Sequence, residues 1–295
     1  MVFDIVLGVG FLRQTTALAR RAETREIAGV VFFYLLPIRK AVAIRNLNIC
    51  FPRFGFKTKQ NIVKEAYVNL AVNLLEIMYF PKFNAEKLKK FIYVEDFTPL
   101  FDALKKGKGV LVTSGHFSNW ELSAFAPAAF SNQSFKIIAK IQANKSVNDK
   151  MNEYREKLGN EIIEMGVGLR KMFSMISDNR IICFLMDQNA HPDYSVYADF
   201  FGKSIPTYAG PAKLALKYGC EIIFGYLMRD INYKYKGFIK KIDYSDLKEY
   251  NEKNIGILTQ RINDELEKII KEEPGQWLWF HRRFKNLYKD MKIYG

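Results

Sequence analysis

Residues 110–121 of this chain, VLVTSGHFSNWE, decide its fold class. Val110 to Thr113 is a short apolar run bounded by glycines, which predicts a buried strand. Residues 122–126 predict a helix. Between the two lies a turn that carries His116. The stretch therefore predicts a strand that passes through a turn directly into a helix.

The same alternation continues outward from this unit along the chain. Strands are expected at 109–113, 135–141, 181–186, 221–228 and 236–242. Helices are expected at 59–80, 97–106, 119–130, 146–158, 168–178, 208–218 and 252–272. Strands that alternate with helices favour an α/β fold with a mixed, mainly parallel sheet that is flanked by helices. We expect this domain to occupy residues 51–295, behind a helical segment at 1–50.

Composition narrows the possible partners and the compartment. A formal charge of +14 and 15% aromatic residues suggest an acidic partner, which could be nucleic acid, an anionic membrane or an acidic protein. A basic soluble enzyme without such a partner is the plain alternative. Cys50, Cys183 and Cys220 lie far apart, so neither a disulfide framework nor a structural zinc site is expected. A reducing, cytoplasmic setting fits best.

The N-terminal 50 residues indicate contact with a membrane surface. Their apolar runs, Ile5 to Leu12 and Ile27 to Ile38, fall short of the roughly 20 residues that span a bilayer. Arginines lie between and after these runs, a pattern that favours a helix lying at anionic lipid. A helical hairpin that packs on the core is the alternative.

In the helix expected at 59–80, the polar stripe of Asn69, Asn73 and Glu76 is interpreted as a solvated or capping face.

His116 and Glu121 are the candidate catalytic pair. The chain has three histidines, so few residues compete for the role of a general base. With Ser118 as N-cap, Glu121 would occupy N3, from where its carboxylate could reach an imidazole in the preceding turn. The same placement describes a capping box, in which Glu121 only caps the helix. Spacing alone leaves both readings open.

Four segments in order resemble the lipid A (lauroyl/myristoyl) acyltransferases, a branch with the glycerol-3-phosphate acyltransferase-like fold. GHFSNWE at 115–121 resembles the motif of a histidine followed by an acid. RKAVAIRNLNICFP at 39–52 looks like the N-terminal signature of this branch. MDQN at 186–189, followed by DFFG at 199–202, resembles its central block. QWLWFHRRFK at 276–285 is similar to its C-terminal signature.

This resemblance implies acyl transfer from a thioester to a hydroxyl of a lipid A precursor. The donor would be acyl carrier protein or acyl-CoA, and the enzyme would work on the cytoplasmic face of the bacterial inner membrane, peripheral or monotopic. His116 would be the general base and Glu121 would orient it. No cofactor or metal is expected, because a thioester is already activated. The expected substrate-binding residues are Lys140, which replaces the arginine usual in the family, and Asp187, Gln188, Arg282 and Arg283.

Three other functions were weighed. An acyltransferase of the same fold could act on a lysophospholipid or a phosphatidylinositol mannoside. A serine hydrolase is disfavoured because the chain has no G-x-S-x-G elbow. A basic nucleic-acid-binding protein would explain the charge and the aromatics, but no recognisable binding motif is present and no nucleic acid is expected.

Overall fold

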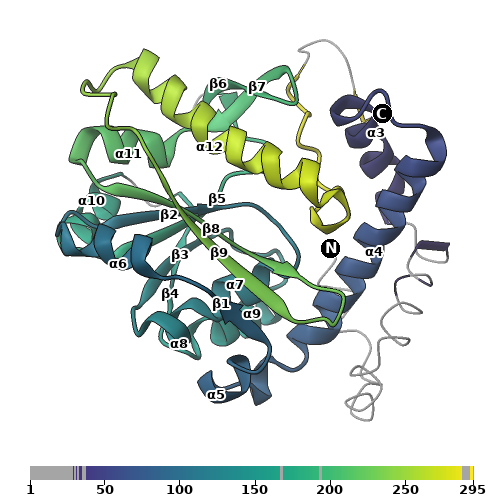
Figure 1. Ribbon diagram of the computed structural model, residues 1–295, viewed down its shortest axis with the longest axis horizontal. Coiled ribbons are helices and arrows are strands. Elements are labelled where there is room, and N and C mark those ends of the chain that lie inside the picture. Colours follow the sequence, from purple (N-terminus) through teal and green to yellow (C-terminus); the bar gives the residue numbers. More distant parts are fainter. Residues whose placement is uncertain are drawn as a thin grey trace.

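A twisted central sheet forms the middle layer of the protein, which we describe from a computed structural model (Figure 1). The structure describes residues 29, 31, 33–34, 38–166, 169–192, 195–287 and 293–294. Within them the sheet has seven strands in the order β1-β9-β8-β2-β5-β3-β4. These are β1 (Ile92–Val94), β2 (Val110–Ser114), β3 (Phe135–Ala139), β4 (Glu161–Glu164), β5 (Ile181–Leu185), β8 (Glu221–Arg229) and β9 (Tyr235–Ile242). Strands β8, β2, β5, β3 and β4 are mutually parallel, whereas β9 is antiparallel to β8.

Helices cover both faces of this sheet. One face packs against α6 (Thr98–Lys105), α7 (Trp120–Phe125), α8 (Pro127–Ser131) and α9 (Lys145–Glu156). The other packs against α10 (Leu169–Ser177), α11 (Gly210–Tyr218) and the long α12 (Glu252–Glu272). Alternate residues of a strand point to opposite faces. Accordingly, Val110 of β2 packs in the core on the α6–α9 face, and its neighbour Leu111 packs in the core on the α10–α12 face.

A helical layer flanks one side of the sheet, where α3 (Lys40–Cys50) and α4 (Phe56–Ile77) lie in Figure 1. The short elements η2 (Phe80–Lys82) and α5 (Ala85–Leu88) follow α4. Val42, Ala43 and Leu47 of α3 share the main core with α12. Asn46 donates to the carbonyls of Trp279 and His281 at 2.7 and 2.8 Å. Residues 40–50 therefore pack on the α/β domain.

The sequence predictions of fold are largely confirmed. All five expected strands and all seven expected helical regions are present, with 119–130 divided into α7 and α8. Strands β1 and β4 were missed because they have only 3 and 4 residues. The antiparallel hairpin of β6 (Ser195–Phe200) and β7 (Lys203–Tyr208) was also missed. The strand β6 carries the Asp-Phe pair that had been interpreted only as a motif.

The predicted membrane-associating segment mostly lies outside the described residues. Of residues 1–38, the structure describes only five positions. Among the helices of the described part, none is long and apolar enough to cross a membrane.

Candidate active site

The loop between β2 and α7 forms the centre of the site. It leaves the carboxyl end of β2 at Ser114 and carries His116, as expected, in the turn before the helix. The C-terminal segment runs alongside it, with Phe117 bridged to Trp277 and the Leu278 amide donating to the His116 carbonyl at 3.1 Å. Neighbouring β5 ends at Leu185, so Asp187 and Gln188 reach the same edge of the sheet.

Asp187 holds the His116 imidazole. Its Oδ1 lies 2.7 Å from His116 Nδ1, and its Oδ2 accepts from the His116 amide and from Trp277 Nε1, both at 2.7 Å. Burial alone raises the pKa of the Asp187 carboxyl, but the charge and hydrogen bonds of His116, with the bond from Trp277, outweigh it and hold the pKa at about 2. An ionised Asp187 makes Nδ1 the protonated ring nitrogen, which leaves Nε2 as the basic one.

Gln188 covers that basic nitrogen. Its amide Nε2 donates to His116 Nε2 at 3.0 Å, and Gln188 as a residue is exposed. An exposed amide can swing away when a hydroxyl approaches. The arrangement of carboxylate, imidazole and a displaceable group on Nε2 is suited to a general base.

Glu121 does not contact His116, contrary to the predicted pairing. Its carboxylate is held by Arg155 of α9 through two bonds of 2.8 Å, and both side chains are buried. Burial by itself lowers the pKa of the Arg155 guanidinium. The charge and hydrogen bonds of Glu121 outweigh that effect, so the pKa is raised overall. Asn119, not Ser118, caps the helix by accepting from the Leu122 amide at 2.9 Å. With the N-cap one residue later, Glu121 is at N2 and faces α9.

Ser118 has a strained backbone, with φ of 47°. Such a conformation in a residue other than glycine persists only when its surroundings hold it. The Ser118 amide donates to the Gln276 carbonyl at 2.7 Å, and its carbonyl accepts from Asn73 Nδ2 at 2.5 Å. The turn that carries His116 is therefore held by α4 and by the C-terminal segment.

Buried Arg229 completes this support. Its guanidinium donates to Asn69, to Asn73 at 2.6 Å and to the Tyr235 hydroxyl at 2.8 Å, while Glu76 accepts from Asn119 at 2.8 Å. The polar stripe of α4 is thus part of a hydrogen-bonded network that reaches the His116 loop, with Asn73 buried inside it. Its interpretation as a solvated or capping face was wrong, because an arginine from a distant strand fills the space opposite it.

The remaining predicted substrate residues fall into two groups. Lys140, just past β3, and Arg282 are exposed. Arg283 is 1% exposed and donates to the carbonyls of Gln188 and Pro206, both at 3.0 Å, and to Thr207 at 2.9 Å. Arg283 thus ties the Gln188 backbone to the β6–β7 hairpin, and its expected contact with an acidic substrate group stays a prediction.

Two residues of the C-terminal segment were missed by the sequence reasoning. Trp277 donates to the Asp187 carboxylate, a contact that no spacing in the sequence indicates. His281 is half-buried, and desolvation lowers its pKa to about 4, although the charge of Asp187 opposes this. Its Nδ1 is buried with no hydrogen-bond partner. In the described part of the chain, no group of three or more His, Cys, Asp or Glu is placed to hold a metal ion.

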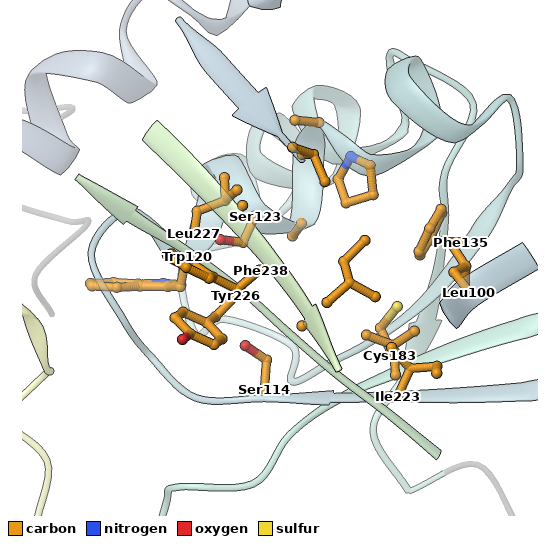
Figure 2. Close-up of a pocket in the computed structure, with 18 of the residues that line it drawn as sticks. Leu100, Ser114, Trp120, Ser123, Phe135, Cys183, Ile223, Tyr226, Leu227 and Phe238 are labelled. Atoms are coloured by element: carbon orange, nitrogen blue, oxygen red, sulfur yellow. The ribbon is translucent and has the colours of Figure 1, made fainter. Parts of the chain in front are cut away.

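An apolar cavity of about 140 Å³ opens beside this loop, between the sheet and helices α6–α8 (Figure 2). Trp120 and Ser114 line its end near the His116 loop, and the centroid of the Trp120 ring lies 5.5 Å from that of the His116 ring. Leu100, Phe135 and Cys183 line the other end, which the buried side chains of Leu100 and Phe135 close. Apolar cavities of this order take apolar ligands and stay dry without them. A histidine suited to act as a general base thus lies beside a cavity whose apolar lining suits a hydrocarbon.

Comparisons with known proteins agree with this geometry. Residues 2–286 match the family described as bacterial lipid A biosynthesis acyltransferase. The phosphatidylinositol mannoside acyltransferase of Mycolicibacterium smegmatis is 24% identical over 227 residues, 74% of this chain and 70% of that protein. The lipid A biosynthesis palmitoleoyltransferase of Escherichia coli is 23% identical over 258 residues, and the lauroyltransferase of the same organism 21% over 249; each match covers 84% of this chain and 79% of the relative. The chain therefore belongs to the bacterial lipid A biosynthesis acyltransferase family and is an O-acyltransferase.

Proposed function

We propose that this enzyme transfers a fatty acyl chain from a thioester to a hydroxyl of a membrane lipid, with His116 as general base and Asp187 as its orienting carboxylate. The observation that carries the proposal is the His116–Asp187 pair at the mouth of an apolar cavity. Neither feature alone would specify acyl transfer, because a buried histidine–aspartate pair can be structural and a cavity can be a packing defect. Together they supply a base and a place for the chain.

The reaction needs one proton shuttle. His116 Nε2 removes the proton of the acceptor hydroxyl as that oxygen bonds to the thioester carbonyl carbon. The carbon–sulfur bond then breaks, and the imidazolium returns the proton to the departing sulfur, which leaves as a free thiol. Asp187, with its pKa held at about 2, stays ionised at neutral pH and stabilises the imidazolium. This is the logic of a Ser-His-Asp triad, with the lipid hydroxyl in place of serine.

Glu121 serves this mechanism indirectly. Its ion pair with Arg155 links the first turn of α7 to α9 and so supports the helix that follows the His116 loop. Removing one member of a buried ion pair leaves an uncompensated charge and is strongly destabilising. We therefore assign Glu121 a positioning role.

The donor would place its chain in the cavity and its thioester beside His116. Coenzyme A and acyl carrier protein present the acyl group on the same phosphopantetheine arm, so both fit this arrangement. Burial of apolar chain in the cavity contributes about 0.8 kcal/mol per methylene. The chain's formal charge of +14 favours an acidic donor such as the carrier protein.

The acceptor would approach from the carboxyl edge of the sheet. Three large apolar side chains are exposed there: Ile141 at 55%, Met165 at 57% and Leu185 at 39%. They follow or end β3, β4 and β5, which are neighbours in the sheet, and exposed Lys140 lies among them. Clustered exposed apolar groups mark lipid or protein contacts. We propose that this edge meets an anionic lipid surface, on the cytoplasmic face of a bacterial inner membrane.

The family favours a lipid A precursor as acceptor, with a phosphatidylinositol mannoside as the alternative suggested by the mycobacterial relatives. The test is to incubate the purified protein with an acyl donor, either acylated carrier protein or acyl-CoA, and with each lipid as acceptor. Mass spectrometry then identifies the acylated lipid product. In the His116→Ala variant we expect a loss of roughly 10²–10⁴ in rate with an unchanged fold. A folded His116→Ala variant with wild-type turnover would refute the proposed base.

A further inference from the structure

Gly225 occupies an unusual place for a glycine. It lies in the interior of β8, which pairs with β2 on one side and β9 on the other. A glycine inside a strand loses more conformational entropy on folding than alanine and contributes no packing. Its presence there needs a physical reason.

The fold itself does not require this glycine. The φ angle of Gly225 is outside the left-handed region, where glycines such as Gly219 are found. A Cβ at Gly225 would lie 3.7 Å from Val112 Cγ1 and from the Phe238 carbonyl, which is ordinary van der Waals contact. By contrast, a Cβ at Gly237 on β9 would come within 2.6 Å of Val94, so packing explains that glycine.

The missing side chain of Gly225 would project into the apolar cavity. Gly225 lines the cavity together with Ile223 and Leu227, the residues two positions away on the same face of β8. Gly225 also keeps part of its surface accessible although β8 is an interior strand. The cavity side of β8 is therefore open at this one position.

The register of the sheet places Gly225 past the His116 loop and before the closed end. Thr113 pairs with Phe224, so Gly225 is level with Ser114, two residues before His116, where the thioester would lie. Phe135 is level with Val110 through Ile181, four residues earlier along β2, which is ~13 Å away at the rise of a β-strand. A chain that enters beside Ser114 must pass Gly225 to reach the end closed by Leu100 and Phe135.

We propose that Gly225 is a specificity-determining residue that keeps the cavity open to long acyl chains. This inference rests on the proposed acyl transfer and concerns the length of the chain that the same site accepts. A bulky side chain at this position would fill the passage beyond the first few carbons. Short chains would still bind, because they end before the obstruction.

Binding of non-reactive donor analogues tests this directly. S-butyl- and S-dodecyl-pantetheine carry the arm that is shared by both donor types but have no carbonyl to transfer. Their dissociation constants would be measured by titration calorimetry for the wild type, Gly225→Ala, Gly225→Leu and Gly256→Leu. Gly256 on α12 has nothing within 4 Å of its added Cβ and does not line the cavity, so it is the matched control. Thermal melts would accompany each titration.

Each buried methylene tightens binding roughly fourfold, so the wild type should prefer the dodecyl compound by at least about 100-fold. In Gly225→Leu this preference should fall below about tenfold, with butyl binding unchanged. Gly225→Ala, whose methyl group fits at ordinary contact, should fold and show a smaller loss. Wild-type preference in a folded Gly225→Leu protein, or in both variants if only Gly225→Ala folds, would overturn the role of Gly225. Absence of any chain-length preference in the wild type would instead reject the acyl cavity itself.

Discussion

The replacement Asp187→Asn tests whether Asp187, rather than the sequence-predicted Glu121, orients His116. An asparagine has the same shape but only one acceptor oxygen. Two donors, the His116 amide and Trp277 Nε1, converge on Oδ2 at 2.7 Å, so the amide oxygen is expected to take that position. The NH₂ group then faces His116 Nδ1, which must become the acceptor. The proton moves to Nε2, and the base is lost.

The expected loss of reaction rate follows from this change of tautomer. Loss of a general base costs roughly 10²–10⁴ in rate, and the wrong tautomer in a Ser-His-Asp triad lies at about 10⁴. Stability changes as well. The Asp187 pKa of about 2, against about 3.9 in an unfolded chain, corresponds to about 2.6 kcal/mol at neutral pH. Because the folded pKa is the lower one, this stability is present above pH ~4 and is lost as the pH falls toward about 2.

The assay is the release of free thiol from the acyl donor, measured with a thiol reagent, together with thermal melts between pH 2 and 7. We expect the Asp187→Asn variant to be nearly inactive, folded at pH 7, and less sensitive than the wild type to acid between pH 4 and 2. Glu121→Gln is the matched control, since it makes the same chemical change in the other carboxylate. A folded Asp187→Asn enzyme with activity within tenfold of wild type would refute the reasoning.

Two further predictions concern groups around the site. Glu121→Leu or Arg155→Met alone should destabilise the protein by about 3–5 kcal/mol, because each leaves an unpaired charge buried. The double variant leaves no such charge, so it should recover most of the stability in denaturant melts and most of the activity in thiol-release assays. Equal losses in the single and double variants would contradict a positioning role. His281 has a folded pKa of about 4 against about 6.5 unfolded, so the unfolded chain binds the extra proton and stability should fall by roughly 3 kcal/mol as the pH drops from 6.5 to 4. His281→Gln should flatten that slope, and an unchanged slope would exclude His281 as its source.

Local patterns in the sequence were sufficient for the fold class. The apolar runs of β2, β5 and β8 lie in the sheet interior, where both faces are covered by helices, so they appear as near-continuous hydrophobic stretches. The amphipathic period of α12 was also clear, and apolar residues recur at helical spacing in α4. The short β1 and β4 carry too few residues for a period to be recognised.

The site was only partly accessible from sequence. The position of His116 in a turn was predictable, because a strand and a helix that follow each other so closely must be joined there. The partner of the imidazole was not. Glu121 is near in sequence, but the helix turns it toward Arg155 on α9. Asp187, 71 residues away, reaches His116 only because β2 and β5 are adjacent parallel strands.

The sequence by itself thus determined most of the elements, their order, the family and the candidate histidine, since these depend on local propensity and on motifs within short segments. Only the tertiary structure decided which carboxylate holds that histidine, that Arg283 is a buried structural residue, and that Gly225 faces an open cavity. Each of these depends on which strands are neighbours and in which register they pair. Strand order and register join residues that are far apart in the chain, and no local pattern encodes them.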